Sequence, residues 1–389
     1  MGVGYVEFDD DESCRSGWAS VDGGEPFRIE GIGDLETGSR WVLNVKHFTI
    51  RKKGLFRIKH VLREDFFRLK PTILKRELGL SKALPAVTVQ IISSVYSRVM
   101  RLLSERFEDD FFSADYSIPA YLASKLLPPK QFAIPPALGS DLAVAVKEST
   151  QENQAPQQMS VPRGASLTSY YFPRSGYSAY LFSNPLPTAE NWGRVEVKGG
   201  IKKIGFYRGK SIKGTEAWLS KMKGLHESGV AMFLSVNVTS IDAGIAQYAQ
   251  FGVGANYQRR YASLPEIIYL AEFCQLEVGS GFKCDSKVYS PRCKEVETGS
   301  ISAGIASEVE WIALSTPVAK KYTPMGAYIR AYDRIACLHA AHEFVSAGLN
   351  FGSCGAGKVQ LYLSGGQEKE AGELAAKLGM MSPANSFNR

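Results

Sequence analysis

Hydrophobic positions recur with a helical period over residues 57–70, which predicts an amphipathic helix there. Pro71 ends this helix because proline cannot continue it, and a short helix follows with Gly79 as its stop. A second apolar stripe predicts a long helix over about 87–107, and the proline-rich stretch 117–138 cannot form one continuous helix. The stripe of the first helix consists of Ile58, Leu62, Phe66 and Leu69.

The C-terminal half shows two further helical patterns, near 264–276 and over 323–348. Its last part, 352–379, predicts a glycine-rich loop, a strand over 359–363, a turn and a helix. Ser364 and Gln367 have the spacing of a capping box, and acidic residues early in the last helix suit its dipole.

Alternation of apolar and polar residues predicts strands elsewhere in the chain. WVLNVKHFTI (41–50) alternates and is rich in β-branched residues, whereas 1–39 contains many glycines and is expected to be loop-rich. Strand and turn patterns return in SAYLFS (178–183), in GRVEVKGGIKKIGFYRG (193–209) and in VAMFLSVNV (230–238). The basic segment 198–214 is typical of a flexible hairpin or loop.

These patterns predict an α+β protein with a helix-rich N-terminal region and a mixed strand and helix C-terminal domain. Residues 148–168 are rich in Gln, Ser, Pro and Ala and contain few large apolar residues, so they are expected to be a linker. We therefore predict an N-terminal domain over 1–147, with a basic helical segment, and a C-terminal domain over 169–389.

Composition places the chain among ordinary globular proteins, with 44% hydrophobic and 22% charged residues in 389. No run of eighteen apolar residues occurs, so no membrane span is expected, and the acidic N-terminus does not have the pattern of a signal peptide. Six cysteines in a chain of this length favour free thiols and a reducing, cytoplasmic location.

Positive charge is concentrated in two segments. Residues 40–82 hold 13 Lys and Arg against three Asp and Glu, and residues 192–225 hold nine against two. The whole chain has a net charge of only +7, so the remainder is acidic. Such concentration creates a local field that attracts an anionic partner.

Two nucleotide-binding patterns lie side by side near the C-terminus. Gly352 to Lys358 fits the phosphate-loop pattern G-x-x-x-x-G-K, and Leu363 to Gln367 spells LSGGQ, the signature of ABC-type ATPases. Val359 occupies the position of the Mg²⁺-binding hydroxyl, and a strand-like run follows where the motif requires a helix. We therefore predict a loop, a strand and a helix cap here rather than an ATPase.

Other candidate chemistry is equally weak. His339, His342 and Glu343 match neither of the zinc-protease motifs, H-E-x-x-H and H-x-x-E-H. His342 also falls on the apolar stripe of its helix. Cys274, Cys284 and Cys293 do not have the close pairs of a structural zinc site, and Cys274 is expected in the core. No nucleophile elbow occurs, so we predict no catalytic residues, no cofactor and no metal, although a fold can still gather distant carboxylates.

Aromatic residues alternate with cations in both basic segments, a combination that suits phosphate neutralisation and base stacking. We predict backbone-directed, sequence-independent binding of nucleic acid, with the two segments as walls of one groove. The predicted contacts are Arg51, Lys52, Lys53, Arg57, Arg63, Lys202, Lys203, Arg208, Lys210 and Lys213.

The favoured hypothesis is a non-enzymatic coat or nucleoprotein that binds nucleic acid, most simply a single strand, and also self-associates. Two alternatives stay open. One is an enzyme that acts on nucleic acid or nucleotides through carboxylates gathered by the fold, and the other is a protein–protein scaffold with basic faces.

Overall fold

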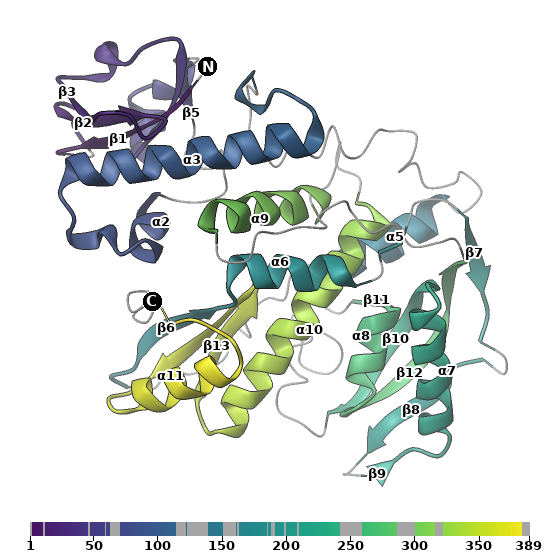
Figure 1. The fold of residues 1–389 in the computed structure, drawn as a ribbon. Coiled ribbons are helices and arrows are strands. Elements are labelled where there is room, and N and C mark those ends of the chain that lie inside the picture. Colours follow the sequence, from purple (N-terminus) through teal and green to yellow (C-terminus); the bar gives the residue numbers. More distant parts are fainter. Residues whose placement is uncertain are drawn as a thin grey trace.

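The structure is a computed structural model, and its described residues form an α+β fold with three sheets and the helices between them (Figure 1). The residues that it describes are 2–10, 12–45, 47–58, 60–62, 71–113, 122, 139–150, 161, 163–184, 186–187, 191–197, 200–207, 210–241, 259–285, 300–315 and 322–382.

The N-terminal region is built on a five-stranded sheet of order β3-β2-β1-β4-β5, in which β4 runs parallel to both β1 and β5. The prediction of loops over 1–39 is therefore wrong. Strand β1 is buried on both faces, so its sequence shows no alternation of apolar and polar residues. The strands are β1 (Gly2–Phe8), β2 (Gly17–Val21), β3 (Phe27–Ile29), β4 (Ser39–Leu43) and β5 (Val61–Leu62).

The segment after β4 departs most from the prediction. The strand expected over 41–50 stops at Leu43, and α1 (His47–Lys52) follows. The helix expected over 57–70 is wrong for 57–62, because Val61 pairs with Trp41 as part of β5, and 63–70 lies outside the described residues. Pairing with a neighbouring strand thus overrides the local helical period.

Helix α3 (Pro85–Phe107) is the long helix that the sequence predicts, and α2 (Pro71–Glu77) precedes it with Gly79 in the left-handed conformation expected of a stop. One face of α3 covers the N-terminal sheet, and another contacts α9 (Ile301–Ser315). Residues far apart in the sequence therefore share one hydrophobic core.

Two more helices lie beside α9. Helix α10 (Pro324–Ser346) confirms the predicted helix over 323–348, and its N-cap Thr323 accepts a hydrogen bond from the Gly326 amide at 3.0 Å. Helix α6 (Arg174–Ser183) replaces the strand predicted at 178–183 and packs on α9. The described length of α5 (Gly139–Thr150) contacts α10 and β11.

The second sheet has the order β11-β10-β12-β8-β9, and β7 also pairs with β12. Helices α7 (Thr215–Glu227) and α8 (Leu264–Leu270) share its main hydrophobic core. The helix predicted over 264–276 ends at Leu270, and Cys274 is buried as expected but begins β12. The strands are β7 (Trp192–Val195), β8 (Lys202–Tyr207), β9 (Lys210–Ser211), β10 (Ala231–Ile241), β11 (Tyr261–Ser263) and β12 (Cys274–Cys284).

The third sheet confirms the predicted strand, turn and helix near the C-terminus. Strands β13 (Asn350–Gly355) and β14 (Lys358–Leu363) form a hairpin, β6 (Ser166–Tyr171) pairs with β14, and α11 (Gln367–Lys377) follows. The Ser364 amide donates to the Gln367 side chain at 2.9 Å, one half of the predicted capping box. The glycine-rich residues 352–355 belong to β13 rather than to a loop.

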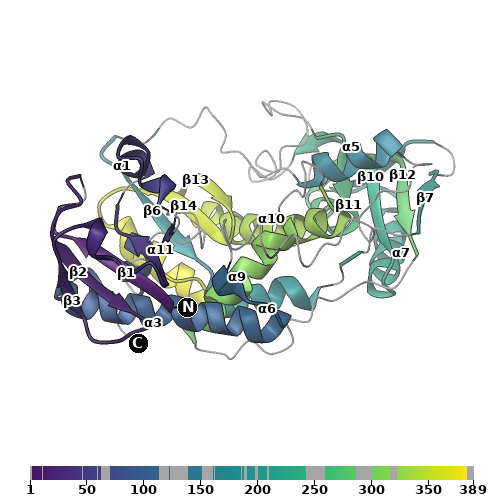
Figure 2. The ribbon, with the colours of Figure 1, turned by 90° about the horizontal axis from the view of Figure 1, so that it is seen from above.

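The predicted linker 148–168 begins inside α5 and ends inside β6, and residues 151–160 and 162 lie outside the described part of the chain. Of the proline-rich stretch 117–138 only residue 122 is described. The division into two domains stays a prediction. From above, the N-terminal sheet and α7 lie at opposite ends of the molecule, with α9 and α10 between them (Figure 2).

Candidate nucleic-acid interface

The basic segment over 198–214 contains a β-hairpin, as its sequence predicts. Strand β8 pairs antiparallel with β9, so that Tyr207 lies opposite Lys210 and Phe206 opposite Ser211. Directly opposed residues point to the same side of the sheet, so the side chains of Tyr207 and Lys210 lie on one face of the hairpin. An aromatic ring and a cation thus share one face of the hairpin.

Gly205 fixes the base of this hairpin. It has a positive φ of 98°, and a β-carbon there would lie 1.8 Å from the Cys274 carbonyl oxygen. The Gly205 amide donates to the Thr215 hydroxyl at 2.9 Å, which joins the hairpin to the first turn of α7. Only glycine allows this approach, and the hairpin is therefore held firmly against the second sheet.

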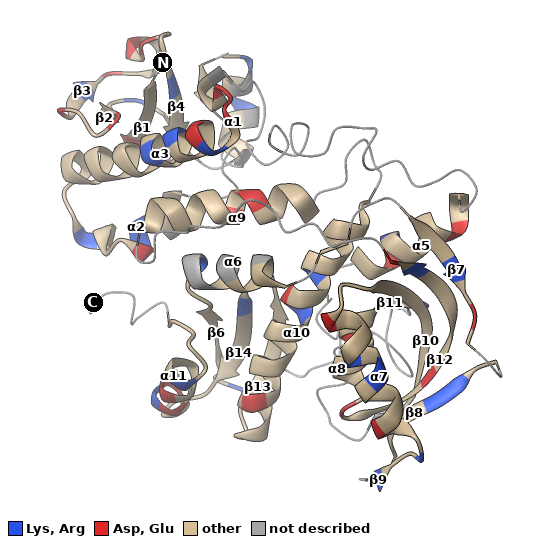
Figure 3. Cartoon of the chain, turned by 45° about the vertical axis from the view of Figure 1, so that its right-hand side comes forward, with Lys and Arg blue, Asp and Glu red and all other residues tan. Residues whose placement is uncertain are grey.

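Cations and apolar groups are both exposed along the hairpin. Lys203 forms an ion pair with Glu277 at 3.3 Å, whereas no carboxylate of the described residues lies within ion-pair distance of Lys202, Lys210 or Lys213. We define the hairpin patch as these four lysines with Ile201, which is 67% exposed, and Tyr207, which is 44% exposed. Figure 3 shows the positive colour on β8 at one end of the molecule.

The other basic segment has a comparable exposed patch on α1. Phe48 is 73% exposed, and Lys52 follows it at i+4 on the same face of the helix. Lys53 is exposed too and donates to the Ser13 carbonyl oxygen at 2.6 Å, and Arg57 is exposed in the turn that follows. We define the α1 patch as Phe48, Lys52, Lys53 and Arg57.

The two patches do not form the walls of one groove. In Figures 1 and 3 the region of α1 and β5 lies at one end of the molecule, and β8 and β9 lie at the other. The prediction of a single groove is therefore wrong for the described residues. Arg63 and Arg208 lie outside them, and of Arg51 only the backbone is described.

The sequence did not reveal that the side chains of Phe48 and Ile201 are exposed, and an apolar side chain must be exposed to contact a ligand. The i, i+4 spacing of Phe48 and Lys52 was the only feature of the sequence that could have indicated a shared exposed face. Arg194 and Lys223 lie within the second basic segment but form exposed ion pairs with Asp141 and Glu272.

The amides of the glycine-rich turn that matches the phosphate-loop pattern already bind a side chain of the protein. The amides of Ala356 and Gly357 both donate to the Asp333 carboxylate of α10, each at 2.9 Å. Tyr177 of α6 donates its hydroxyl to the same carboxylate. Lys358 begins a strand and not a helix. The amides that would hold a phosphate therefore bind a carboxylate of the protein itself.

Burial and the negative charge of Asp333 raise the pKa of Tyr177 well above its ordinary value. Tyr177 therefore stays protonated at neutral pH and keeps its hydrogen bond to Asp333. The effect supports a structural anchor between α6, α10 and the β13–β14 turn.

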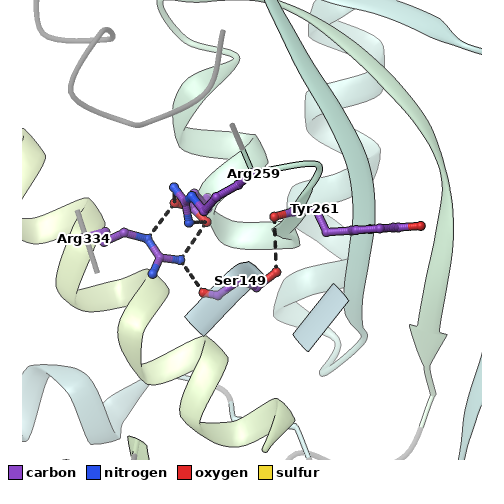
Figure 4. A network of polar contacts seen from close by, with 5 residues as sticks. Ser149, Arg259, Tyr261 and Arg334 are labelled. Carbon is purple, nitrogen blue, oxygen red and sulfur yellow. Dashed lines mark hydrogen bonds and ion pairs between the residues drawn. The ribbon is translucent and has the colours of Figure 1, made fainter. Parts of the chain in front are cut away.

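A second buried polar network joins α5, α8 and α10 (Figure 4). The Glu266 carboxylate, only 1% exposed, accepts from Arg259 and from Arg334, each at 2.8 Å. Arg334 also donates to the Ser149 carbonyl oxygen at 2.7 Å, and the Ser149 hydroxyl donates to the Tyr261 carbonyl oxygen. The network ties the end of α5 to the second sheet.

Charge and burial oppose each other in this network. Burial alone would raise the pKa of Glu266, but the two guanidinium groups outweigh it and hold the pKa below the ordinary value. Burial, offset in part by Glu266, lowers the pKa of Arg259 to about 10. Glu266 and Arg259 are therefore both charged at neutral pH.

The remaining candidates offer little chemistry. His339 is exposed, and His342 is half-buried and stacks on Phe273 with ring centroids 6.3 Å apart. Cys274 and Cys284 occupy opposite ends of β12, and Cys293 lies outside the described residues. Within the described ranges no group of three or more His, Cys, Asp and Glu could hold a metal ion.

Comparisons with known proteins leave the family open. No protein-family model matches the chain, and no curated protein matches its sequence. Solved structures of Phi29 DNA polymerase resemble the fold weakly. The complex with primer-template DNA gives a TM-score of 0.46 at 11% identity, over 94% of this chain and 80% of that one.

The complex of the same polymerase with single-stranded DNA gives 0.46 at 10% identity, over 94% and 80% of the two chains. Its orthorhombic crystal form gives 0.48 at 11% identity, over 94% and 81%. At TM-scores below 0.5 this similarity supports no inference about the present chain.

None of the helices in the described part is long and apolar enough to cross a membrane.

Proposed function

We propose that the protein binds single-stranded nucleic acid through two separate basic patches, the hairpin patch and the α1 patch. Each patch combines exposed cations, which neutralise phosphates, with an exposed aromatic ring on which an unpaired base can stack. Binding of this kind follows the sugar–phosphate backbone and tolerates any base sequence.

One observation carries the proposal. Lys202, Lys210 and Lys213 are exposed on or beside the hairpin that also exposes Tyr207, without a described carboxylate to neutralise them. An ordinary solvated face intersperses both signs of charge, as the pairs of Arg194 and Lys223 do. Unbalanced lysines on a rigid hairpin with an aromatic neighbour therefore suit a polyanion better than they suit solvent alone.

The direct test replaces Lys202, Lys210 and Lys213 together by Gln. We expect the affinity for a labelled single strand of about 20 nucleotides to fall about tenfold or more at low salt. The slope of log Kd against log salt should decrease by about 2, because about 0.7 counterions are released for each phosphate that is neutralised. Fluorescence anisotropy over a series of salt concentrations measures both quantities.

A matched control removes the same charge elsewhere. Lys82, Lys147 and Lys377 are exposed on other elements, and their triple replacement by Gln should leave the salt slope nearly unchanged. Equal losses in the two triple variants would mean that net charge alone drives binding, and no binding of the unmodified chain at low salt would end the proposal.

The aromatic part of the proposal makes a separate prediction. Phe48→Ala and Tyr207→Ala should each weaken single-strand binding by about 1–3 kcal/mol, because a base loses its stacking surface. Duplex binding should change little, since paired bases do not expose their faces. Leu84→Ala removes an apolar side chain of similar exposure, 72%, and serves as the control in the same anisotropy assay.

We also propose that the protein coats nucleic acid without acting on it as an enzyme, and that copies of the protein associate with one another. Size measurement over a range of concentrations, with and without the single strand, tests self-association. Incubation of the bound strand with Mg²⁺ and Mn²⁺ tests the enzymatic alternative, and cleavage or extension of the strand that a chelator abolishes would favour an enzyme over a coat protein.

A further inference from the structure

Strand β12 places one carboxylate beside the hairpin patch. The strand lies between β8 and β10 in the second sheet, so Glu277 stands opposite Lys203 on one side and opposite Asn237 on the other. One carboxylate oxygen of Glu277 lies 3.3 Å from the Lys203 ammonium, and the other accepts a hydrogen bond from the Asn237 side-chain amide at 3.3 Å. We call these three residues the Glu277 row.

The Glu277 row lies on the face of the sheet that points away from the main hydrophobic core. Successive residues of a strand point to opposite faces, and the neighbouring Ile204 and Leu276 are buried in the core with α7 and α8. The side chain of Lys203 is 62% exposed and that of Glu277 is 23% exposed, and Asn237 is exposed as well. A ligand on the hairpin patch can therefore reach the Glu277 carboxylate.

This carboxylate opposes the binding of a simple anion. A phosphate that binds Lys203 must take the place of Glu277 and then lies close to a second negative charge, which costs free energy. An ion pair with an exposed lysine contributes at most about 1 kcal/mol to folding, so stability gives little reason for a carboxylate at this position. The effect of Glu277 on ligands is the larger of the two.

We propose that Glu277 makes the hairpin patch select single-stranded nucleic acid over other polyanions, an inference that rests on the proposed function. Unpaired bases carry N–H groups that can donate to the carboxylate, as the cytosine amino group does to Glu in base recognition. A phosphate of the same strand then binds Lys203, so both charges of the broken ion pair regain a partner. Polyphosphate offers no such donor, and its binding leaves the carboxylate facing an anion.

Glu277→Gln tests this selection. Affinity for a polyphosphate chain should rise about tenfold at low salt, because Lys203 is released and the repulsion disappears. Affinity for an oligo-dC strand of similar length should change less than about threefold, because the same substitution also removes an acceptor for the cytosine amino group. Fluorescence anisotropy with labelled oligo-dC, alone and in competition with polyphosphate, gives the ratio of the two Kd values.

Glu373→Gln on α11 is the matched control. Its ion pair with Lys369 is exposed, and the substitution removes the same charge outside the second sheet. The ratio of the two Kd values should stay as in the unmodified chain. An equal change of the ratio in both variants would overturn the proposal, because net charge and not the position of Glu277 would set the selection. An unchanged ratio in Glu277→Gln would overturn it too.

The proposed function and the selection by Glu277 fail in different ways. Unchanged oligo-dC binding after replacement of Lys202, Lys210 and Lys213 by Gln would show that the strand does not bind the hairpin patch, and both proposals would fall. Loss of oligo-dC binding in that triple variant, together with an unchanged ratio in Glu277→Gln, would overturn the selection alone.

Discussion

Glu266→Gln is expected to lower the free energy of unfolding by about 3–5 kcal/mol, because it leaves two buried guanidinium groups without their shared counter-ion. Arg259 is fully buried and Arg334 is 2% exposed, so water cannot replace the lost charge. Chemical denaturation at neutral pH measures the loss. The control is Glu373→Gln on α11, whose ion pair with Lys369 is exposed and should contribute about 0.5 kcal/mol or less.

The same network predicts a dependence on pH. The pKa of Glu266 is held below its ordinary value of 4.5, so its contribution to stability is present above that value and is lost as pH falls through the lower folded pKa. The difference in stability between the unmodified chain and Glu266→Gln should therefore shrink in acid. A difference that stayed constant down to strongly acidic pH would contradict the assigned charge state.

The long helices were predictable because their apolar residues recur with a helical period. Helix α3 buries one stripe over many turns, and α10, which is buried on most sides in its first half, contributes to two hydrophobic cores. The hairpin β8–β9 was predictable for a related reason. Its glycines and alternating cations are local features, and Gly205 is needed where the hairpin meets β12.

The N-terminal sheet was not predictable from such patterns. Val3 and Tyr5 face α3, while Val6 and Phe8 belong to the core on the other side, so every position of β1 appears apolar. The short strand β5 has only two residues and depends on β4 for its hydrogen bonds. It forms only because the folded chain brings it beside β4, and the local sequence pattern contains no information about that contact.

The candidate interface shows the same limit. Its cations could be located from charge density alone, but their arrangement in space could not, and the two patches lie at opposite ends of the molecule (Figure 3). A single strand that contacts both patches must follow the surface between them, whereas two short strands could bind independently. The length dependence of affinity therefore distinguishes one continuous path from two separate sites.

Asp333→Asn is expected to destabilise the protein by about 2–4 kcal/mol, because a carboxylate that accepts from two amides, a hydroxyl and the Cys337 thiol becomes an amide that has only one acceptor oxygen. The amides of Ala356 and Gly357 and the Tyr177 hydroxyl then compete for that oxygen. Tyr177→Phe removes one donor but leaves the carboxylate on the turn, so its effect should be near 1 kcal/mol. Thermal unfolding gives the order of the two variants.

Hydrogen exchange of the turn shows whether this loss is local. Exchange at residues 354–358 should accelerate strongly in Asp333→Asn and only slightly in Tyr177→Phe. Because Asp333 already holds the turn amides, ATP or pyrophosphate should not raise the melting temperature of the unmodified chain. Stabilisation by either ligand would show that the amides of the turn can bind phosphate. Gly352 to Lys358 would then be interpreted as a nucleotide-binding motif after all.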